Sequence, residues 1–293
     1  MSDLGSTVPL RQLGRLMLEW RNCSGLSQAR AAELLEMGAS SLARIEKAET
    51  GRIKTVVIKQ ACEIYGVPDD IAEGMIRLAQ QAKVKSWWHS YTDLMPKNLD
   101  VYLGLEAAAS GYTSYQPELI PGLLQIEAYD RALLCERWPE APEPERDRRA
   151  QIKQRRQAAI TRSHRPLDLD VVIGQAALQR TVGDPRIMVS QLRHLADVST
   201  RDNISVRVLP FEAGYPGGIA LLPFVILDFG NPPPGEPAEP PVVYLEGAVG
   251  SMYLEYEDDV RFYYSSHEKV REAALDEVAT RNLLRRLARE YGS

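Results

Sequence analysis

Residues 25–51, GLSQARAAELLEMGASSLARIEKAETG, constrain the fold of this chain more than any other segment. Apolar residues recur there at steps of three and four, which predicts one short helix over 27–35 and another over 39–48. Only residues 36–38 join the two helices, and small alanines occupy the middle of the first one. Two helices this short, joined this tightly, are expected to cross at a steep angle.

The second helix of this pair has an inner and an outer side. Leu42 and Ile45, three residues apart, are expected to point to the core. The outer side begins with short side chains and ends with long cations: Ala39, Ser40, Ser41, Ala43, Arg44 and Lys47. Such a helix can enter the major groove of double-stranded DNA, where Arg44 can bond a guanine or a phosphate and Ser40 a base edge. The pair therefore predicts a DNA-binding helix-turn-helix.

Two further polar residues of the pair have different expected roles. Gln28, in the first turn of the first helix of the pair, is placed to bond a DNA phosphate or its neighbouring base. The free N–H groups and the positive dipole end of the helix would support the phosphate contact. Phosphates would repel Glu46, so we expect Glu46 to form a structural ion pair with Arg15 or Arg21. The alternative for the whole segment is an ordinary helical hairpin whose cations are only solvated.

The residues around the pair are also predicted to be helical. The apolar face of a first helix comprises Leu10, Leu13, Met17 and Trp20. Further helices over 54–65 and from Pro68 bring the number to five. Residues 1–84 are therefore expected to form an all-α helix-turn-helix domain.

The remainder of the chain has a mixed pattern. Residues 85–98 are expected to form an aromatic linker, and residues 99–293 a regulatory or dimerisation domain. Strand-like runs occupy 167–173, 204–210, 224–229 and 242–246. Helical periodicity occupies 98–110, 125–135, 143–163, 184–200, 258–273 and 276–291. This order predicts a multidomain chain, in which an α+β domain rather than a doubly wound sheet follows the five-helix domain.

Three segments of the linker and the second domain allow two interpretations each. The aromatic residues of 87–91 form either a cage for a ligand or, as we favour, a packed strap. The basic helix over 143–163 is favoured as a solvated face over a second DNA or partner surface. The helix over 276–291 is either a dimer element or an intramolecular lid.

Composition bounds the class of protein. The net charge is −5, yet residues 1–59 hold nine Lys or Arg against six Asp or Glu, so a mildly basic head precedes an acidic body. The cysteines Cys23, Cys62 and Cys135 are widely spaced and indicate free thiols in a reducing compartment. Neither a membrane-spanning apolar run nor an export signal is found, so a cytoplasmic location and no membrane partner are expected.

The helical pair resembles the XRE family, the lambda-repressor and Cro-like regulators. The residues that match its signature are Ser27, Gln28, Ala32, Leu35, Leu42, Arg44, Ile45 and Glu46. Three family positions differ, since Glu36 and Ala48 replace glycines and Ala31 replaces a leucine. Ala39 also stands where many relatives carry glutamine. If the turn needs a left-handed residue, we expect Gly38 to supply it, because a left-handed Glu36 would cost about 1 kcal/mol.

The second domain is similar to the C-terminal domain of unknown function of actinobacterial WhiJ-like regulators. The blocks that match are 87–96, 115–134, 208–214, 223–229 and 242–247. The resemblance implies a transcriptional regulator, often encoded beside a small acidic partner protein and sometimes described as antitoxin-like. It supplies neither an effector nor a catalytic residue.

No complete catalytic constellation is found in the sequence. HEKVR at 267–271 begins like the H-E-x-x-H motif of zinc peptidases, but Arg271 occupies the position of the second ligand. A self-cleaving repressor needs a desolvated lysine, and Lys97, Lys153 and Lys269 are expected at a junction and in charged helices. The histidines are expected at surface or packing positions. We therefore expect no enzymatic activity, no cofactor and no metal.

Together these patterns predict a dimeric repressor that reads a pseudo-palindrome through the major groove. The alternative is an antitoxin-like interaction module that binds a small acidic protein, with DNA binding secondary. A small-molecule sensor is a third possibility and would require an enclosed pocket.

Overall fold

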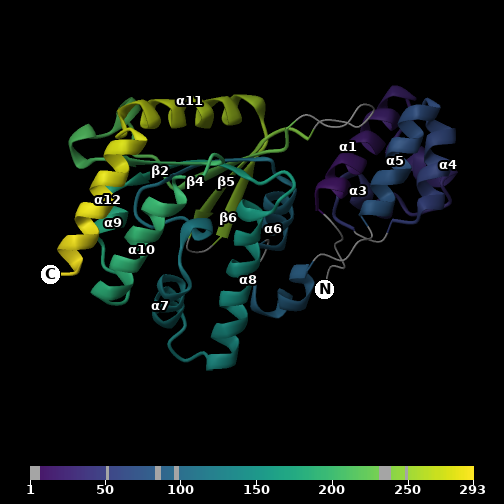
Figure 1. The fold of residues 1–293 in the computed structure, drawn as a ribbon. Coiled ribbons are helices and arrows are strands. Elements are labelled where there is room, and N and C mark those ends of the chain that lie inside the picture. The colour runs from purple at the N-terminus through teal and green to yellow at the C-terminus, as the bar shows by residue number, and fades with distance from the viewer. Residues whose placement is uncertain (1–6, 51–52, 83–86, 96–98, 231–238, 248–249) are drawn as a thin grey trace. The chain divides into compact units, whose positions relative to one another are not determined.

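A computed structural model of the chain describes residues 7–50, 53–82, 87–95, 99–230, 239–247 and 250–293 (Figure 1). Two compact units make up the chain, and the first comprises residues 1–90, 100–108 and 229–239. Each unit is therefore built from more than one stretch of the chain. The expected domain boundaries at 84 and 99 stay a prediction. Lys97 and most of the proline-rich stretch 231–241 lie outside the described residues.

The first unit contains the five expected helices. They are α1 (Thr7–Cys23), α2 (Gln28–Leu34), α3 (Ala39–Glu46), α4 (Thr55–Tyr65) and α5 (Asp69–Gln81). Their shared core is fully apolar at its centre, where Leu13, Met17, Leu42, Ile58 and Met75 are inaccessible to solvent. The periodicity of α1 is thereby confirmed, although Trp20 at its end is only partly buried.

Four helices of this unit end in the same hydrogen-bonded turn, a Schellman motif. After α2, the Met37 N–H donates to the Ala32 carbonyl at 2.9 Å, and after α3, the Glu49 N–H donates to the Arg44 carbonyl at 2.8 Å. The motif requires one residue in the left-handed conformation just past the helix. Glycine supplies that residue after α1 and α4.

The left-handed residues after α2 and α3 are not glycines. Glu36 has φ 52° and Ala48 has φ 55°, whereas Gly25 and Gly66 take the same role after α1 and α4. The expectation that Gly38 would supply the left-handed residue is wrong, because Gly38 has φ −70° and is the N-cap of α3. The helix also ends at Glu46 rather than at 48, since the left-handed Ala48 cannot continue it.

A close approach of two backbones fixes α1 against α3. A Cβ atom at Gly14 would lie 2.7 Å from the carbonyl oxygen of Glu46 and 2.8 Å from that of Ile45. Only glycine therefore fits at this position of α1. The contact sets the depth at which the C-terminal end of α3 is buried.

A six-stranded mixed sheet forms the centre of the second unit. Its strands are β1 (Gly111–Gln116), β2 (Asp168–Gly174), β3 (Ile204–Leu209), β4 (Phe224–Asp228), β5 (Val242–Gly247) and β6 (Gly250–Leu254). Their order is β3-β2-β1-β4-β5-β6, with β1, β2 and β3 parallel and the other pairings antiparallel. All four predicted strands are present, and β1 and β6 are additional. The α+β fold class is confirmed.

Helices cover both faces of this sheet (Figure 1). Outside the first unit's bundle the helices are α6 (Leu99–Ala108), α7 (Glu127–Arg137), α8 (Glu143–Thr161), α9 (Gln175–Gln179), α10 (Pro185–Val198), α11 (Glu257–Ala273) and α12 (Glu277–Tyr291). Short 3-10 helices are η1 (Trp87–Leu94), η2 (Gly122–Leu124), η3 (Phe211–Ala213) and η4 (Pro216–Gly218). One face packs on α11, whose Val260 and Val270 contact the apolar side chains of β4, β5 and β2. Most of α6 belongs to the first unit.

The last helix, α12, packs within its own unit. Leu283, Leu284 and Leu287 are buried, and α12 lies along α10 (Figure 1). The turn before it covers the edge of the sheet, because the N–H of Val208 donates to Thr280 Oγ1 at 3.1 Å and its carbonyl accepts from the Leu275 N–H at 2.9 Å. The structure thus supports the intramolecular role for 276–291, because its three leucines are buried within the unit.

Within the described ranges, each helix is either too short or too polar to cross a membrane. Cys62 is buried, Cys23 and Cys135 are exposed, and none of the three is in a disulfide.

Candidate nucleic-acid interface

The outer side of α3 is open to solvent. Leu42, Ile45 and Glu46 are buried and anchor the helix. The remaining residues of α3 and its C-cap are exposed, except that Ala43 is half-buried: Ala39, Ser40, Ser41, Ala43, Arg44 and Lys47. The structure therefore brings six of the seven predicted DNA-contacting residues onto one accessible surface.

The charge of this surface is positive because the acid of α3 points inward. The guanidinium of Arg44 lies along the end of the helix, where Nη2 donates to the carbonyl of Glu49 at 3.3 Å. Lys47 follows as the C-cap residue. The first turn of α3 carries only short side chains, and nothing lies closer than 3.8 Å to a Cβ built at its N-cap, Gly38. A polyanion can approach the first turn closely and meet cations at the other end.

Glu46 forms the predicted ion pair, and its partner is Arg21. Arg21 Nε donates to Glu46 Oε1 at 2.6 Å and Nη2 donates to Oε2 at 3.2 Å, a two-pronged pairing in which both side chains are buried. The hydrogen bond with Glu46 raises the pKa of Arg21. Arg15, the other candidate, pairs instead with Glu239 of the 229–239 segment.

Gln28 belongs to the same network. Its Nε2 donates to Glu46 Oε2 at 2.8 Å, and the side chain is half-buried. Ser27 is the predicted N-cap of α2 and accepts from the Arg30 N–H at 3.3 Å. The carboxylate of Glu46 thus ties the first turn of α2 to α1 and α3, and the predicted contact of Gln28 with a phosphate stays a prediction.

The aromatic segment does not form an open cage. Trp88 and Tyr91 are both buried, and the guanidinium groups of Arg148 and Arg155 lie 5.7 and 5.5 Å from the centre of the Tyr91 ring. The side chain of His89 is outside the described part of the structure. These contacts favour the packed strap over the ligand cage.

Arginines of the basic helix α8 form ion pairs and ring contacts within the fold. Arg148 pairs with Asp93 at 2.8 Å, Arg149 pairs with Glu145 at 2.7 Å, and Arg149 also lies 4.1 Å above the ring of Trp138. Arg148 and Arg149 thus have contacts within the fold, and the choice between a solvated face and a second DNA or partner surface stays a prediction.

Lys153 has a different environment from the one expected. It is largely buried, it pairs with Asp130, and its Nζ donates to Gln125 Oε1 at 2.6 Å. Burial lowers the pKa of Lys153, although Asp130 opposes the shift. The placement of Lys153 on a solvated charged face is therefore wrong. Its hydrogen-bond partners are a carboxylate and an amide, so the lysine closes a structural network.

The HEKVR segment lies on α11 and is directed toward the sheet. His267 is buried, and its ring centre lies 6.4 Å from that of Phe224. Burial lowers the pKa of His267. Arg271 pairs with Asp170 of β2 at 3.3 Å. Both side chains therefore have packing or pairing roles in the domain.

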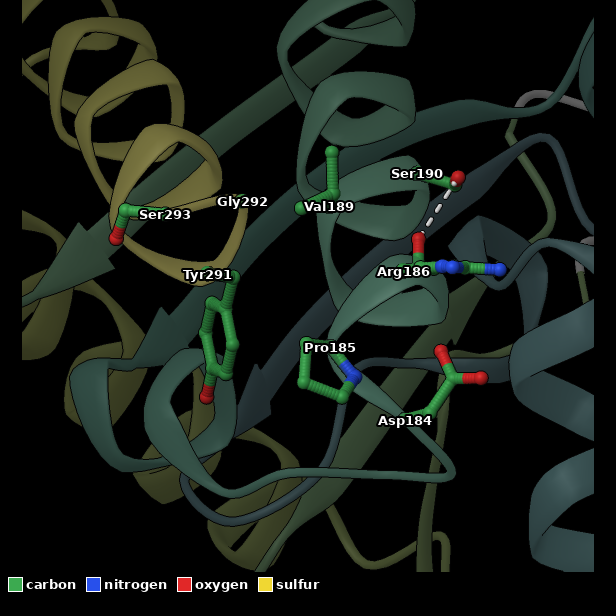
Figure 2. Close-up of a pocket in the computed structure, with 8 residues that line it drawn as sticks. All are labelled: Asp184, Pro185, Arg186, Val189, Ser190, Tyr291, Gly292 and Ser293. Carbon is green, nitrogen blue, oxygen red and sulfur yellow. Dashed lines mark hydrogen bonds between the residues drawn. The ribbon is translucent and has the colours of Figure 1, made fainter.

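A shallow hollow of about 520 Å³ lies where the start of α10 meets the end of α12 (Figure 2). Its polar groups already serve the fold, since Asp184 caps α10 by accepting from the Ile187 N–H at 2.9 Å and Tyr291 donates to the Gln179 carbonyl at 2.8 Å. The hollow is not the enclosed pocket that a small-molecule sensor would require.

The helix-turn-helix with an exposed, positively charged second helix defines a class, the DNA-binding regulators. In agreement, residues 12–73 match the sequence pattern of a helix-turn-helix domain. Residues 99–286, more than half of the chain, match DUF5753, a domain of unknown function, and the chain belongs to this family. The resemblance to helix-turn-helix regulators with this kind of C-terminal domain is confirmed. No curated protein and no solved structure matches the chain.

Proposed function

We propose that this DNA-binding regulator is a sequence-specific transcriptional repressor that acts by excluding polymerase from its operator. The observation that carries the proposal is the outer side of α3. It has short side chains at its start, exposed cations at Arg44 and Lys47, and its one acid turned inward to Arg21. A helix that enters the major groove needs this combination, since its N-terminal residues approach the base edges. The helix-turn-helix domain supports a regulator rather than an enzyme.

In this proposal two copies of the chain place their α3 helices in successive major grooves of a pseudo-palindrome, with half-sites about 10 bp apart or a multiple of that. Support for association comes from the loop between β3 and β4. Four large apolar residues of that loop are exposed: Phe211 by 60%, Tyr215 by 74%, Ile219 by 45% and Leu222 by 65%. We take these exposed apolar side chains as the contact surface of the proposed dimer.

The test is selection of bound fragments from random DNA by the full chain, followed by affinity measurements with Arg44→Ala. We expect this variant to bind the selected site about 1–3 kcal/mol more weakly. Arg77→Ala on α5 is the matched control, because Arg77 is also exposed but lies on another helix. An equal loss in both variants, or no selected sequence at all, would contradict the proposal.

The oligomeric state separates the proposal from the antitoxin-like alternative. Sedimentation of the purified chain should show a dimer, which Tyr215→Glu together with Leu222→Glu weakens. If the chain is instead a monomer that co-purifies with a small acidic protein and shows no DNA sequence preference, the alternative is the correct one.

A further inference from the structure

The chemistry of α3 restricts the bases that it can read. Its outer side combines the methyl groups of Ala39 and Ala43 with the hydroxyls of Ser40 and Ser41 and the guanidinium of Arg44. The structure describes α3 in full, and none of its exposed side chains is an amide or a carboxylate. The long acceptor groups that read the amino donors of adenine and cytosine are thus missing from this helix.

Two parallel rows of side chains follow the outer side of α3. Residues four apart lie one above the other on a helix, so Ala39 and Ala43 form one row, and Ser40 and Arg44 form the next. The first row is apolar, and its methyl groups project only a short way from the helix backbone. The second row begins with a short hydroxyl and ends with five N–H donors and no acceptor.

Each row matches one base in the major groove. The only apolar group that a base pair offers there is the C5-methyl of thymine, which alanine can contact. The only base that offers two acceptors side by side is guanine, through O6 and N7, and arginine donates to both. Gln28 lies on α2 rather than α3, and its Nε2 donates to Glu46 Oε2 at 2.8 Å.

We propose that α3 reads a half-site in which a thymine, contacted through its methyl group by Ala39 and Ala43, lies beside a guanine contacted by Arg44. The proposal rests on the major-groove binding proposed above and adds the identity of the bases. It makes the two alanines specificity residues, although their side chains form no hydrogen bond.

The thymine contact is tested by replacing each thymine of the selected operator with deoxyuridine, which keeps the base pair and removes only the methyl group. We expect affinity to fall about fourfold at the contacted thymine of each half-site, the worth of one buried methyl group. Ala39→Gly binds the unmodified operator more weakly and shows a smaller deoxyuridine effect. The same substitution at Ser40 is the control, and it retains the full deoxyuridine effect.

The guanine contact is tested with 7-deazaguanine, which lacks the N7 acceptor. We expect about tenfold weaker binding by the unaltered chain and no further loss in Arg44→Ala. Selection that yields a defined operator without a deoxyuridine effect, or with no guanine in the half-site, overturns this inference and leaves the proposed function standing. Selection that yields no sequence preference overturns the proposed function itself.

Discussion

Replacing Glu36 by glycine should stabilise the helix-turn-helix. Glu36 lies in the left-handed conformation at φ 52°, is exposed, and ends α2 in a motif that glycine completes elsewhere in the same unit. The left-handed conformation costs a residue with a Cβ about 1–2 kcal/mol. Glycine in turn adds about 0.4–1 kcal/mol of chain entropy to the unfolded state. The difference is a gain of about 0.5–1 kcal/mol in the free energy of unfolding of this unit.

Amide hydrogen exchange in the full chain measures this gain for the helix-turn-helix alone. The amides of α3 that exchange by opening of the unit should exchange about two- to fivefold more slowly in Glu36→Gly. Gly66→Ala is the control for the reverse change, because it introduces a Cβ at a left-handed position. Gly66 has φ 70° after α4, and a Cβ there would meet no atom within 4 Å, so only backbone strain is added and exchange should accelerate to a similar extent.

Glu36→Ala separates the backbone from the charge, because alanine removes the carboxylate and keeps the strain. If Glu36→Gly is no more stable than Glu36→Ala, the reasoning from the left-handed conformation is refuted. Ala48→Gly should give a smaller gain, since the methyl group of Ala48 is partly buried against the core.

Three other perturbations have calculable directions. Gly14→Ala should lower the free energy of unfolding of the first unit by about 1–3 kcal/mol, measured by exchange, because the new methyl overlaps the end of α3. Glu46→Ala should lower the free energy of unfolding of the first unit by about 3 kcal/mol, because it leaves the Arg21 charge buried without a partner. Arg21→Met in the same chain should restore part of this stability, as measured by urea denaturation. The pKa of His267 is lowered by burial, so the folded state binds fewer protons than the unfolded state below the ordinary value of 6.5. The stability of the second unit should fall as the pH decreases from 6.5 toward the lowered pKa. In a plot of the urea midpoint against pH, His267→Leu should flatten this part of the curve. An unchanged slope would exclude His267 as its source.

The sequence was informative where a local pattern decides the structure. The outer side of α3 follows from helical spacing, and β2 to β5 are rich in the β-branched and apolar residues that favour strands. β1 was missed because its residues are largely polar. Ser114 is fully buried there, and its hydroxyl donates to the Phe224 carbonyl at 2.8 Å, a partner 110 residues away.

Pairings between residues far apart in the sequence were not predictable either, because local sequence patterns do not specify them. The acid of α3 had two possible arginine partners on α1, and in the folded protein it pairs with Arg21, whereas Arg15 pairs with Glu239. The burial of Lys153 depends on Asp130, which reaches it from α7. The preference of glycine for the left-handed conformation also led to the wrong residue, Gly38. The hydrogen bonds that end α2 select the left-handed position regardless of which residue occupies it.

The 229–239 segment has a practical consequence for dissecting this protein. It is joined at both ends to strands of the sheet, yet Glu239 is buried in the other unit, where it pairs with Arg15 and accepts from Arg11 Nε at 3.0 Å. A fragment cut after residue 84 would therefore keep every helix-turn-helix residue and lose the carboxylate that these two arginines share. Truncation is thus an unsafe way to assign DNA binding to one half of the molecule, and point substitutions in the intact chain are the sounder tool.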